Sequence, residues 1–309
     1  MFKIYTVFPR WFCAWVFRAV NMLQDVVKKY GTPIYVNHEI IHNKFIISYF
    51  EKLGVIFEPN LENIPSGSIV VLSAHWVWPS FREKLKEKWL KYIDATCPLV
   101  EKVHREAKMF IEKGYKILYI GQKNHQEALW VYDYDIEQIH ILSTKEDVDM
   151  LDVSFTDWKL ALLTQTTLSV DDTKEVIDYI IQKFPHVEIP KASDICYATT
   201  NRQNAVKELS KIIDTLFVVG SKNSSNSNKL KHLAEKLWKK AYLVDTYEDI
   251  LDEYLVNAGD IWVASWASWP EELVQWVVKY LESKGGTFIE ELRVVEEKVT
   301  FPYTLELIS

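Results

Sequence analysis

The sequence has few glycines, few cysteines and no long apolar run. There are 9 glycines among 309 residues, well below the usual ~7% of a globular chain. The 3 cysteines cannot all pair with one another, which argues against a disulfide-stabilised secreted domain. The apolar stretches are far shorter than the roughly 20 residues that a membrane-spanning helix needs. We therefore expect a cytoplasmic protein without a membrane segment.

Positive charge is also in deficit. The chain has 36 Lys and Arg against 43 Asp and Glu, which gives a net charge of -7. General binding to nucleic acid or to anionic membranes requires clustered positive charge, so we expect neither partner. The composition, 48% hydrophobic and 26% charged, is that of a globular protein long enough for two or three subdomains. An anionic ligand would need a local site.

A loose threefold repeat organises the chain, and each copy contains one cysteine. Each cysteine follows a short extended segment and precedes an amphipathic helix. The cysteines are Cys13, Cys97 and Cys196, and the helices are expected over residues 19–29, 99–113 and 201–213. The free amides at a helix N-terminus lower the pKa of a nearby thiol and favour the thiolate that binds metal.

Two strands in each copy end in polar loops. The loops after the first strands contain His42 in one copy, His125 and Glu127 in the next, and Ser224, Ser225 and Asn226 in the last. The loops after the second strands contain His75, Thr166 and Ser268. Strands that alternate with helices predict parallel α/β units, whose ligands bind at the carboxyl ends of the strands.

The predicted fold is α/β, with three α/β subdomains in a pseudo-threefold arrangement around one central cavity. The cysteines and the six polar loops would then face that cavity. We expect the units at residues 1–96, 97–193 and 194–285, followed by a C-terminal tail at 286–309.

Three thiolates around one point, with no fourth cysteine in the chain, suit an iron-sulfur cluster in which one iron lacks a protein ligand. Such an iron is a Lewis acid, and the cluster supplies electrons. The rival is a zinc site with three cysteines and one histidine. Structural zinc sites usually draw on closely spaced cysteine pairs, whereas these cysteines lie far apart in the sequence.

The polar loops predict an anion site and a proton donor. Imidazoles, hydroxyls and amides together can hold a phosphate or diphosphate without a basic patch. Glu127 lies two residues after His125, and a carboxyl group shielded from water has a raised pKa that suits a proton donor. Thr166 could relay or orient that proton. The alternative for Glu127 is an ordinary solvated loop glutamate.

Several motifs carry a resemblance to a known family. They are PRWFC at residues 9–13, HEIIHN at 38–43, SAH at 73–75, DATCPLV at 94–100, TQTTLSVDDT at 164–173, DICYATTNRQ at 194–203 and GSKNSSNSN at 220–228. With these motifs the chain resembles the 4-hydroxy-3-methylbut-2-enyl diphosphate reductase family, which completes the non-mevalonate isoprenoid pathway. The motifs span nearly the whole chain in the family's order.

The resemblance implies a trefoil of three domains and a [4Fe-4S] cluster on Cys13, Cys97 and Cys196. It implies Glu127 as proton source, with Thr166 assisting. It also implies a diphosphate held by His42, His75, His125, Ser224, Ser225, Asn226 and Ser268. The substrate would lose its hydroxyl as water, isopentenyl and dimethylallyl diphosphates would form, and a flavodoxin or ferredoxin would supply the electrons.

Two other functions stay open from the sequence. One is an enzyme of the quinolinate synthase kind, in which the open iron acts as a Lewis acid without net reduction. The other is a non-catalytic relative that keeps the fold. Turnover of the diphosphate substrate would distinguish the first alternative. The second would be favoured if the tryptophans that stand where the family has glycine were all encoded by UGG.

Tryptophan occurs where glycine is expected, and this is the main departure from the family's pattern. The family has glycine at positions that are here Trp11, Trp15, Trp76, Trp130, Trp262 and Trp266. Helix ends at Gly54 and Gly114 have glycine caps, whereas Trp89 and Trp238 occupy the same slot, and Trp158 stands where a turn favours glycine. The 12 tryptophans would make up the glycine deficit. We hypothesise that UGA codons meaning glycine are rendered as tryptophan. Trp276, inside a helix, fits least well.

Overall fold

The structure is a computed structural model that describes residues 2–41, 43–73, 77, 79–212, 214–222, 224–237 and 239–308, without the side chains of Pro79, Val153 and Ser225. The chain divides into two compact units. The first comprises Met1–Gln24, Ile41–Phe50 and Tyr197–Thr304. The second comprises Asp25–Ile40, Glu51–Cys196 and Leu305–Ser309.

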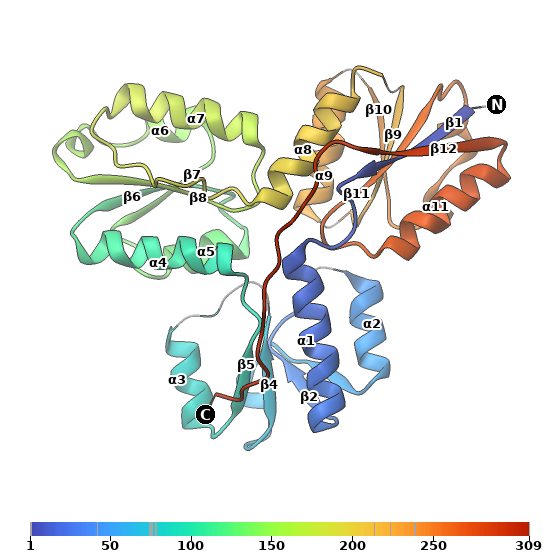
Figure 1. Cartoon of the computed structure of the whole chain (residues 1–309). Helices are drawn as coiled ribbons and strands as arrows, with labels where there is room; N and C mark the ends of the chain where they lie inside the picture. The colour runs from blue at the N-terminus through green and yellow to red at the C-terminus, as the bar shows by residue number, and fades with distance from the viewer. Residues whose placement is uncertain are drawn as a thin grey trace. The chain divides into compact units, whose positions relative to one another are not determined.

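Three parallel sheets form the described part of the chain, one in the first unit and two in the second (Figure 1). The five-stranded sheet of the first unit has the order β10 (Lys240–Val244), β9 (Thr215–Val219), β11 (Ile261–Ser265), β1 (Phe2–Phe8) and β12 (Gly286–Arg293). The four-stranded sheet has the order β3 (Val55–Phe57), β2 (Ile34–Val36), β4 (Ile69–Leu72) and β5 (Lys91–Asp94). The three-stranded sheet has the order β7 (Ile139–Leu142), β6 (Lys116–Ile120) and β8 (Leu160–Thr164).

The same three-strand pattern occurs in every sheet, which confirms the predicted α/β fold and its repeat. The first strand of each copy, β2, β6 or β9, lies between the two strands that follow it in sequence. All of these pairings are parallel. The loops after the first and third strands of a copy therefore leave the same edge of the sheet side by side. The strand that comes second in the sequence of each copy, β3, β7 or β10, was not predicted. Each of these strands lies at an edge of its sheet.

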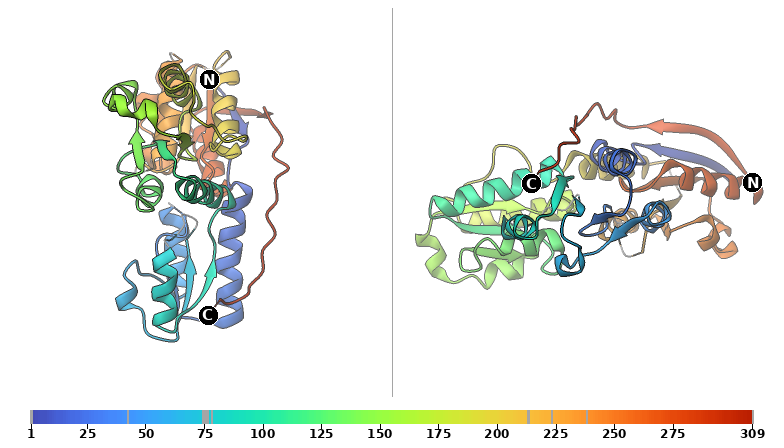
Figure 2. Two further views of the ribbon diagram at one scale, coloured as in Figure 1. Left: turned by 90° about the vertical axis from the view of Figure 1, so that its left-hand side faces the viewer. Right: turned by 90° about the horizontal axis from the view of Figure 1, so that it is seen from below.

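The segment before each cysteine adds to the sheet of another copy. β1 pairs with β11 in the sheet of the third copy, and β5 pairs with β4 in the sheet of the first. Glu188 forms a bridge beside Ala161 of β8, in the sheet of the second. Figure 2 shows β12 running beside β1 as a further strand of the five-stranded sheet. The boundaries of the three predicted units stay a prediction.

Helices cover the sheets. The described helices are α1 (Ala14–Tyr30), α2 (Lys44–Lys52), α3 (Pro79–Glu87), α4 (Pro98–Glu112), α5 (Gln126–Tyr132), α6 (Lys145–Asp149), α7 (Val170–Lys183), α8 (Tyr197–Leu209), α9 (Ser225–Lys236), α10 (Asp252–Leu255) and α11 (Glu271–Ser283), with short 3-10 turns at Leu61–Asn63, Val153–Asp157 and Tyr247–Asp249. In the three-stranded sheet, α4 and α5 cover one face and α6 and α7 the other (Figure 1). Strands β8 and β9 are buried at every residue, as parallel strands with two covered faces are.

Helices α1, α4 and α8 each begin at the residue after a cysteine, which confirms the predicted placement. Cys97 is the N-cap of α4, and Pro98 takes the first helical position, where its missing N–H costs no hydrogen bond. The helices begin one to five residues earlier than the sequence predicts, because the residues directly after each cysteine are already helical.

No helix among the described residues is both long and apolar enough to cross a membrane.

The expectation that a turn at position 158 favours glycine is wrong. Trp158 has φ -91° and ψ 152°, an extended conformation that does not require glycine.

A buried histidine in α4 makes stability depend on pH. His104 is 0% exposed, and burial lowers its pKa to about 3 from the ordinary histidine value of 6.5. Between these values the unfolded chain binds a proton that the folded chain does not, so stability falls as the pH falls from about 6.5 toward 3.

We predict that His104→Phe, which keeps a ring against Tyr134, removes up to about 1.4 kcal/mol of this loss per pH unit. Urea unfolding of both proteins at several pH values from 6.5 to 4.5 measures the difference. Met109→Leu, on the partly exposed face of the same helix, provides the control, since it changes no titratable group and should leave the slope unchanged. Parallel slopes for the parent and His104→Phe would contradict the prediction.

Candidate functional site

The predicted site residues fall into two groups, one in each compact unit. The first unit contains Cys13, Ser224, Asn226 and Ser268, and the second contains Cys97, His125, Glu127, Thr166 and Cys196. His42 and His75 lie outside the described residues, as does the side chain of Ser225.

Glu127 and Thr166 are in direct contact. Glu127 is in the first turn of α5 and is only 5% exposed, so it is not the solvated loop glutamate of the alternative interpretation. The Thr166 N–H donates to Glu127 Oε1 at 2.7 Å, and the Thr166 hydroxyl donates to Oε2 at 3.0 Å. Both carboxyl oxygens are therefore positioned by one residue of the loop after β8, and a proton could pass between the hydroxyl and the carboxyl group.

His125 begins the helix that carries Glu127. Its Nδ1 accepts a hydrogen bond from the Glu127 N–H at 3.2 Å, which makes it the N-cap of α5. The loop leading to it starts at Gly121, where a Cβ would lie 2.6 Å from the Tyr119 ring. Glycine is needed there because the loop passes directly over that ring.

Gln165, which was not predicted as a site residue, joins the two polar loops of this sheet. It is 0% exposed. Its Oε1 accepts from the Gln122 N–H at 3.0 Å, and its Nε2 donates to the Thr167 hydroxyl at 3.1 Å. Its own N–H donates to Ile120 at 2.8 Å. Gln165 therefore fixes the loop of His125 against the loop of Thr166. The only sequence signal is its place in the TQTT motif.

Cys196 is tied to the same loop by its backbone. Its N–H donates to the Thr166 carbonyl at 2.9 Å. Two residues earlier, the buried carboxylate of Asp194 accepts from the Thr164 N–H at 2.9 Å and from Lys102 Nζ at 2.6 Å. The chain before Cys196 is thereby held at the carboxyl end of β8.

Cys97 follows β5 in the neighbouring sheet of the same unit. Its carbonyl accepts from the Glu101 N–H at 2.9 Å, as expected at a helix start. Its side chain packs against Val100 and the buried indole of Trp130. Trp130 thus occupies space directly beside a predicted ligand.

Cys13 has an environment in the first unit that matches that of Cys196. Its N–H donates to the Ala267 carbonyl at 3.1 Å, again in the loop after the third strand of a copy. Its Sγ accepts from the Val16 N–H at 3.5 Å in the first turn of α1. Burial nevertheless raises the pKa of the Cys13 thiol, and the backbone hydrogen bonds only partly offset this. The expected lowering of its pKa is wrong for the protein without metal, because desolvation outweighs the helix terminus.

The predicted anion-binding residues of the first unit lie at two helix starts. Ser224 is the N-cap of α9, and its hydroxyl accepts from the Ser227 N–H at 3.3 Å. Asn226 is in the first turn of that helix. Ser268 precedes α11, and its carbonyl accepts from Asn43 Nδ2 at 2.9 Å. The positive end of the helix dipole at such helix starts favours anions.

Two residues around Cys13 were not predicted as site residues. Tyr197 accepts from the Ala14 N–H at 3.2 Å through its hydroxyl, so it satisfies an amide at the start of α1. Arg202 is 2% exposed and donates to the Trp11 carbonyl at 2.9 Å and to Glu297 at 3.1 Å. Both lie in the DICYATTNRQ motif at residues 194–203, and their place in this long motif was the only sequence signal for a role at the site.

No group of three or more His, Cys, Asp or Glu side chains among the described residues is arranged to hold a metal ion. Cys13 belongs to the first unit and the other two cysteines to the second. None of the three forms a disulfide among the described residues. Their convergence on one cluster stays a prediction.

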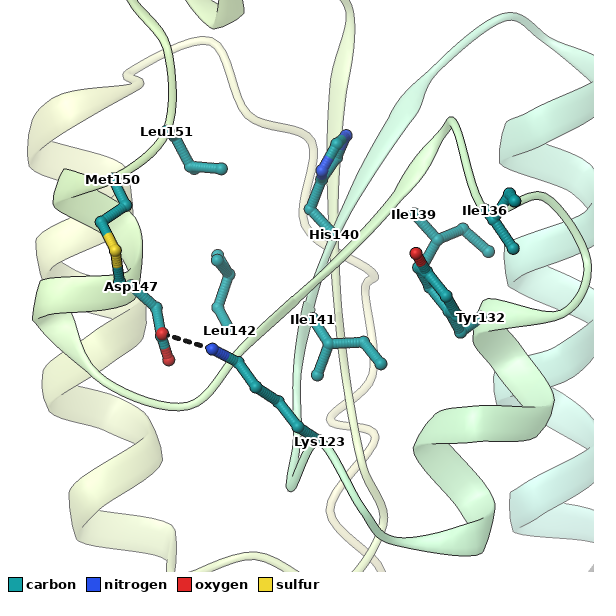
Figure 3. Close-up of a pocket in the computed structure, with 10 residues that line it drawn as sticks. All are labelled: Lys123, Tyr132, Ile136, Ile139, His140, Ile141, Leu142, Asp147, Met150 and Leu151. Carbon is teal, nitrogen blue, oxygen red and sulfur yellow. Dashed lines mark hydrogen bonds and ion pairs between the residues drawn. The ribbon is translucent and has the colours of Figure 1, made fainter.

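A cavity of about 420 Å³ lies along the edge strand β7 in the second unit (Figure 3). Its lining is largely apolar, and Lys123 and Asp147 form an ion pair of 2.6 Å at one side. None of the predicted site residues lines it.

Comparisons with known proteins agree with the motifs. The family model described as LytB protein matches residues 4–282. The 4-hydroxy-3-methylbut-2-enyl diphosphate reductase of Tolumonas auensis is 42% identical over 308 residues, covering 99% of each chain. The reductase of the same name from Histophilus somni is 43% identical over 308 residues, covering 99% of this chain and 98% of the relative.

A solved structure of the E-1-hydroxy-2-methyl-but-2-enyl-4-diphosphate reductase from Plasmodium falciparum superposes with a TM-score of 0.92 and 38% identity. It covers 96% of this chain and 93% of that one. With a family model that matches most of the chain and relatives that match nearly all of it, the chain belongs to the LytB protein family.

Proposed function

We propose that this protein is a 4-hydroxy-3-methylbut-2-enyl diphosphate reductase of the non-mevalonate pathway. The reaction adds two electrons and two protons, breaks the bond between carbon and the hydroxyl group, and releases water and isopentenyl or dimethylallyl diphosphate. The observation that carries the proposal is the near full-length similarity to reductases of this name. Those names also argue against an enzyme of the quinolinate synthase kind.

A [4Fe-4S] cluster on Cys13, Cys97 and Cys196 is part of the proposal. The donor set fits such a cluster, since three thiols outside any disulfide each precede a helix and the sequence has no fourth cysteine. When bound, the cluster supplies electrons and one iron that can act as a Lewis acid. A flavodoxin or ferredoxin would deliver the electrons, and the cytoplasm would be the location.

Glu127 is proposed as the proton source. Its carboxyl group is shielded from water and is held at both oxygens by Thr166, so it stays in one orientation through the reaction. The Thr166 hydroxyl can pass a proton to or from Oε2 with little movement. A fixed acid of this kind is what departure of a hydroxyl group as water requires.

The substrate's diphosphate is proposed to bind His42, His75, His125, Ser224, Ser225, Asn226 and Ser268. Two of these residues support the assignment by their place at helix starts. His125 is the N-cap of α5 and Ser224 is the N-cap of α9, where the positive end of the helix dipole favours an anion.

The test of the function is turnover by protein purified without oxygen and reduced with dithionite. We expect consumption of 4-hydroxy-3-methylbut-2-enyl diphosphate and formation of the two five-carbon diphosphates, measured by chromatography. A protein with its full iron content that leaves this substrate unchanged would contradict the proposal.

We predict that Glu127→Gln lowers kcat about 10²- to 10⁴-fold, because the amide cannot donate the same proton. Thr166→Val should cause a smaller loss, since the backbone N–H still holds Oε1. Glu101→Gln, on the exposed first turn of α4, is the matched control and should leave kcat unchanged. If Glu127→Gln turned over like the parent protein, Glu127 would not be the proton source.

We also predict that replacing any one of the three cysteines by serine lowers the iron bound per chain in oxygen-free preparations, because serine is a poor ligand for iron in such clusters. Ser224→Ala is the contrasting variant. It should keep its iron, because Ser224 is not a proposed cluster ligand, and it should raise KM, because Ser224 belongs to the proposed diphosphate site. Loss of the α9 cap should cost about 1 kcal/mol of stability. Unchanged iron in any cysteine variant would remove that cysteine from the ligand set.

A further inference from the structure

Two tryptophans have a backbone conformation that normally requires glycine. Among the described residues, the left-handed region of φ contains six glycines, Asn257 at 53°, Trp11 at 56° and Trp89 at 57°. Asparagine tolerates this region, because its short side chain bonds to the local backbone. A bulky aromatic residue does not, because its Cβ crowds the backbone.

Trp89 occupies the C-terminal cap of α3 in the place of a glycine. The Trp89 N–H donates to the Lys86 carbonyl at 2.9 Å, and the Leu90 N–H donates to the Leu85 carbonyl at 2.9 Å. This pair of hydrogen bonds defines a Schellman motif, whose left-handed residue is usually glycine.

The end of α4 has the same motif with glycine. The Gly114 N–H donates to Ile111 at 2.9 Å, and the Tyr115 N–H donates to Phe110 at 3.0 Å, with Gly114 at φ 75°. The Trp89 side chain is 81% exposed, so little packing offsets the unfavourable backbone. The two helix ends share this hydrogen-bond pattern, with tryptophan at the left-handed position of one and glycine at that of the other.

Trp11 is held in its conformation from both sides. Its N–H donates to Ser265 Oγ at 3.0 Å, and its carbonyl accepts from Arg202 at 2.9 Å. The left-handed conformation therefore follows from the path of the backbone into Cys13. The indole contributes to neither hydrogen bond.

Buried indoles give a second, independent observation. The Nε1 atoms of Trp15, Trp262 and Trp269 are buried without a hydrogen-bond partner among the described residues. Buried tryptophans normally find a partner for this N–H. Trp15 is 4% exposed and follows Cys13 by two residues, and Trp262 is 1% exposed and stacks on Tyr5 of the neighbouring strand.

We propose that the protein made in its source cell has glycine at positions 11, 15, 89 and 262, because the gene uses UGA codons that this cell reads as glycine. One change of residue type then accounts for the two left-handed tryptophans and for the unpaired indoles at positions 15 and 262, and it reduces the glycine deficit.

Mass spectrometry of the protein from its source, together with the codons of its gene, tests the proposal directly. Peptides that cover positions 11, 15, 89 and 262 should contain glycine, and the four codons should be UGA. Tryptophan in those peptides, or UGG at those codons, would overturn it.

A stability series tests the same idea on recombinant protein. Trp89→Gly should raise Tm above that of Trp89→Ala by about 2 °C or more, since only glycine relieves the left-handed conformation. The exposure of Trp89 means that all three proteins should share one fold. Equal Tm values, or a higher one for alanine, would contradict a requirement for glycine at this cap.

Trp276 provides the matched control. It lies inside α11 and is 43% exposed. Glycine there should lower Tm relative to alanine, because glycine is unfavourable inside a helix. If both positions responded alike, the effect at Trp89 would not come from its backbone conformation.

Discussion

The positive ends of helices supply what this acidic protein lacks at its candidate site. Thiolates and a diphosphate are anions, and the chain has a net charge of -7. Buried arginines near Cys13 do not compensate, since Arg10 pairs with Glu271 and Arg202 pairs with Glu297. The cysteines instead precede α1, α4 and α8, and predicted diphosphate ligands stand at the starts of α5 and α9. The positive end of a helix that starts at such a loop would favour an anion without a basic patch, although at Cys13 burial outweighs this effect on the thiol.

The loop after β8 couples two functions that the proposed reaction requires. Thr166 accepts the N–H of Cys196 with its carbonyl and holds Glu127 with its N–H and hydroxyl. A proposed cluster ligand and the proposed proton donor are thus two hydrogen bonds apart. Gln165 fastens this loop to that of His125. Electrons and protons would then be delivered from groups whose separation is set by one short, buried segment.

The sequence predicted the repeat because each cysteine and each polar loop has a fixed place relative to a strand. It missed the short strands β3, β7 and β10, which carry no polar motif, and the pairing of β1 with β11, which joins residues from opposite ends of the chain. Gln165 and Arg202 were missed because their roles depend on partners distant in sequence. The prediction that the pKa of Cys13 is lowered was wrong, because the burial of a thiol cannot be judged from a helix start alone.

Cluster occupancy is the most direct test of the account, since the proposed chemistry needs three thiols from three repeats on one metal centre. The measurement is iron and sulfide content with a paramagnetic resonance spectrum of protein purified without oxygen and then reduced. We predict about four irons per chain and a signal that changes when the diphosphate substrate is added. A preparation free of iron, or a spectrum that the substrate does not alter, would contradict the central claim.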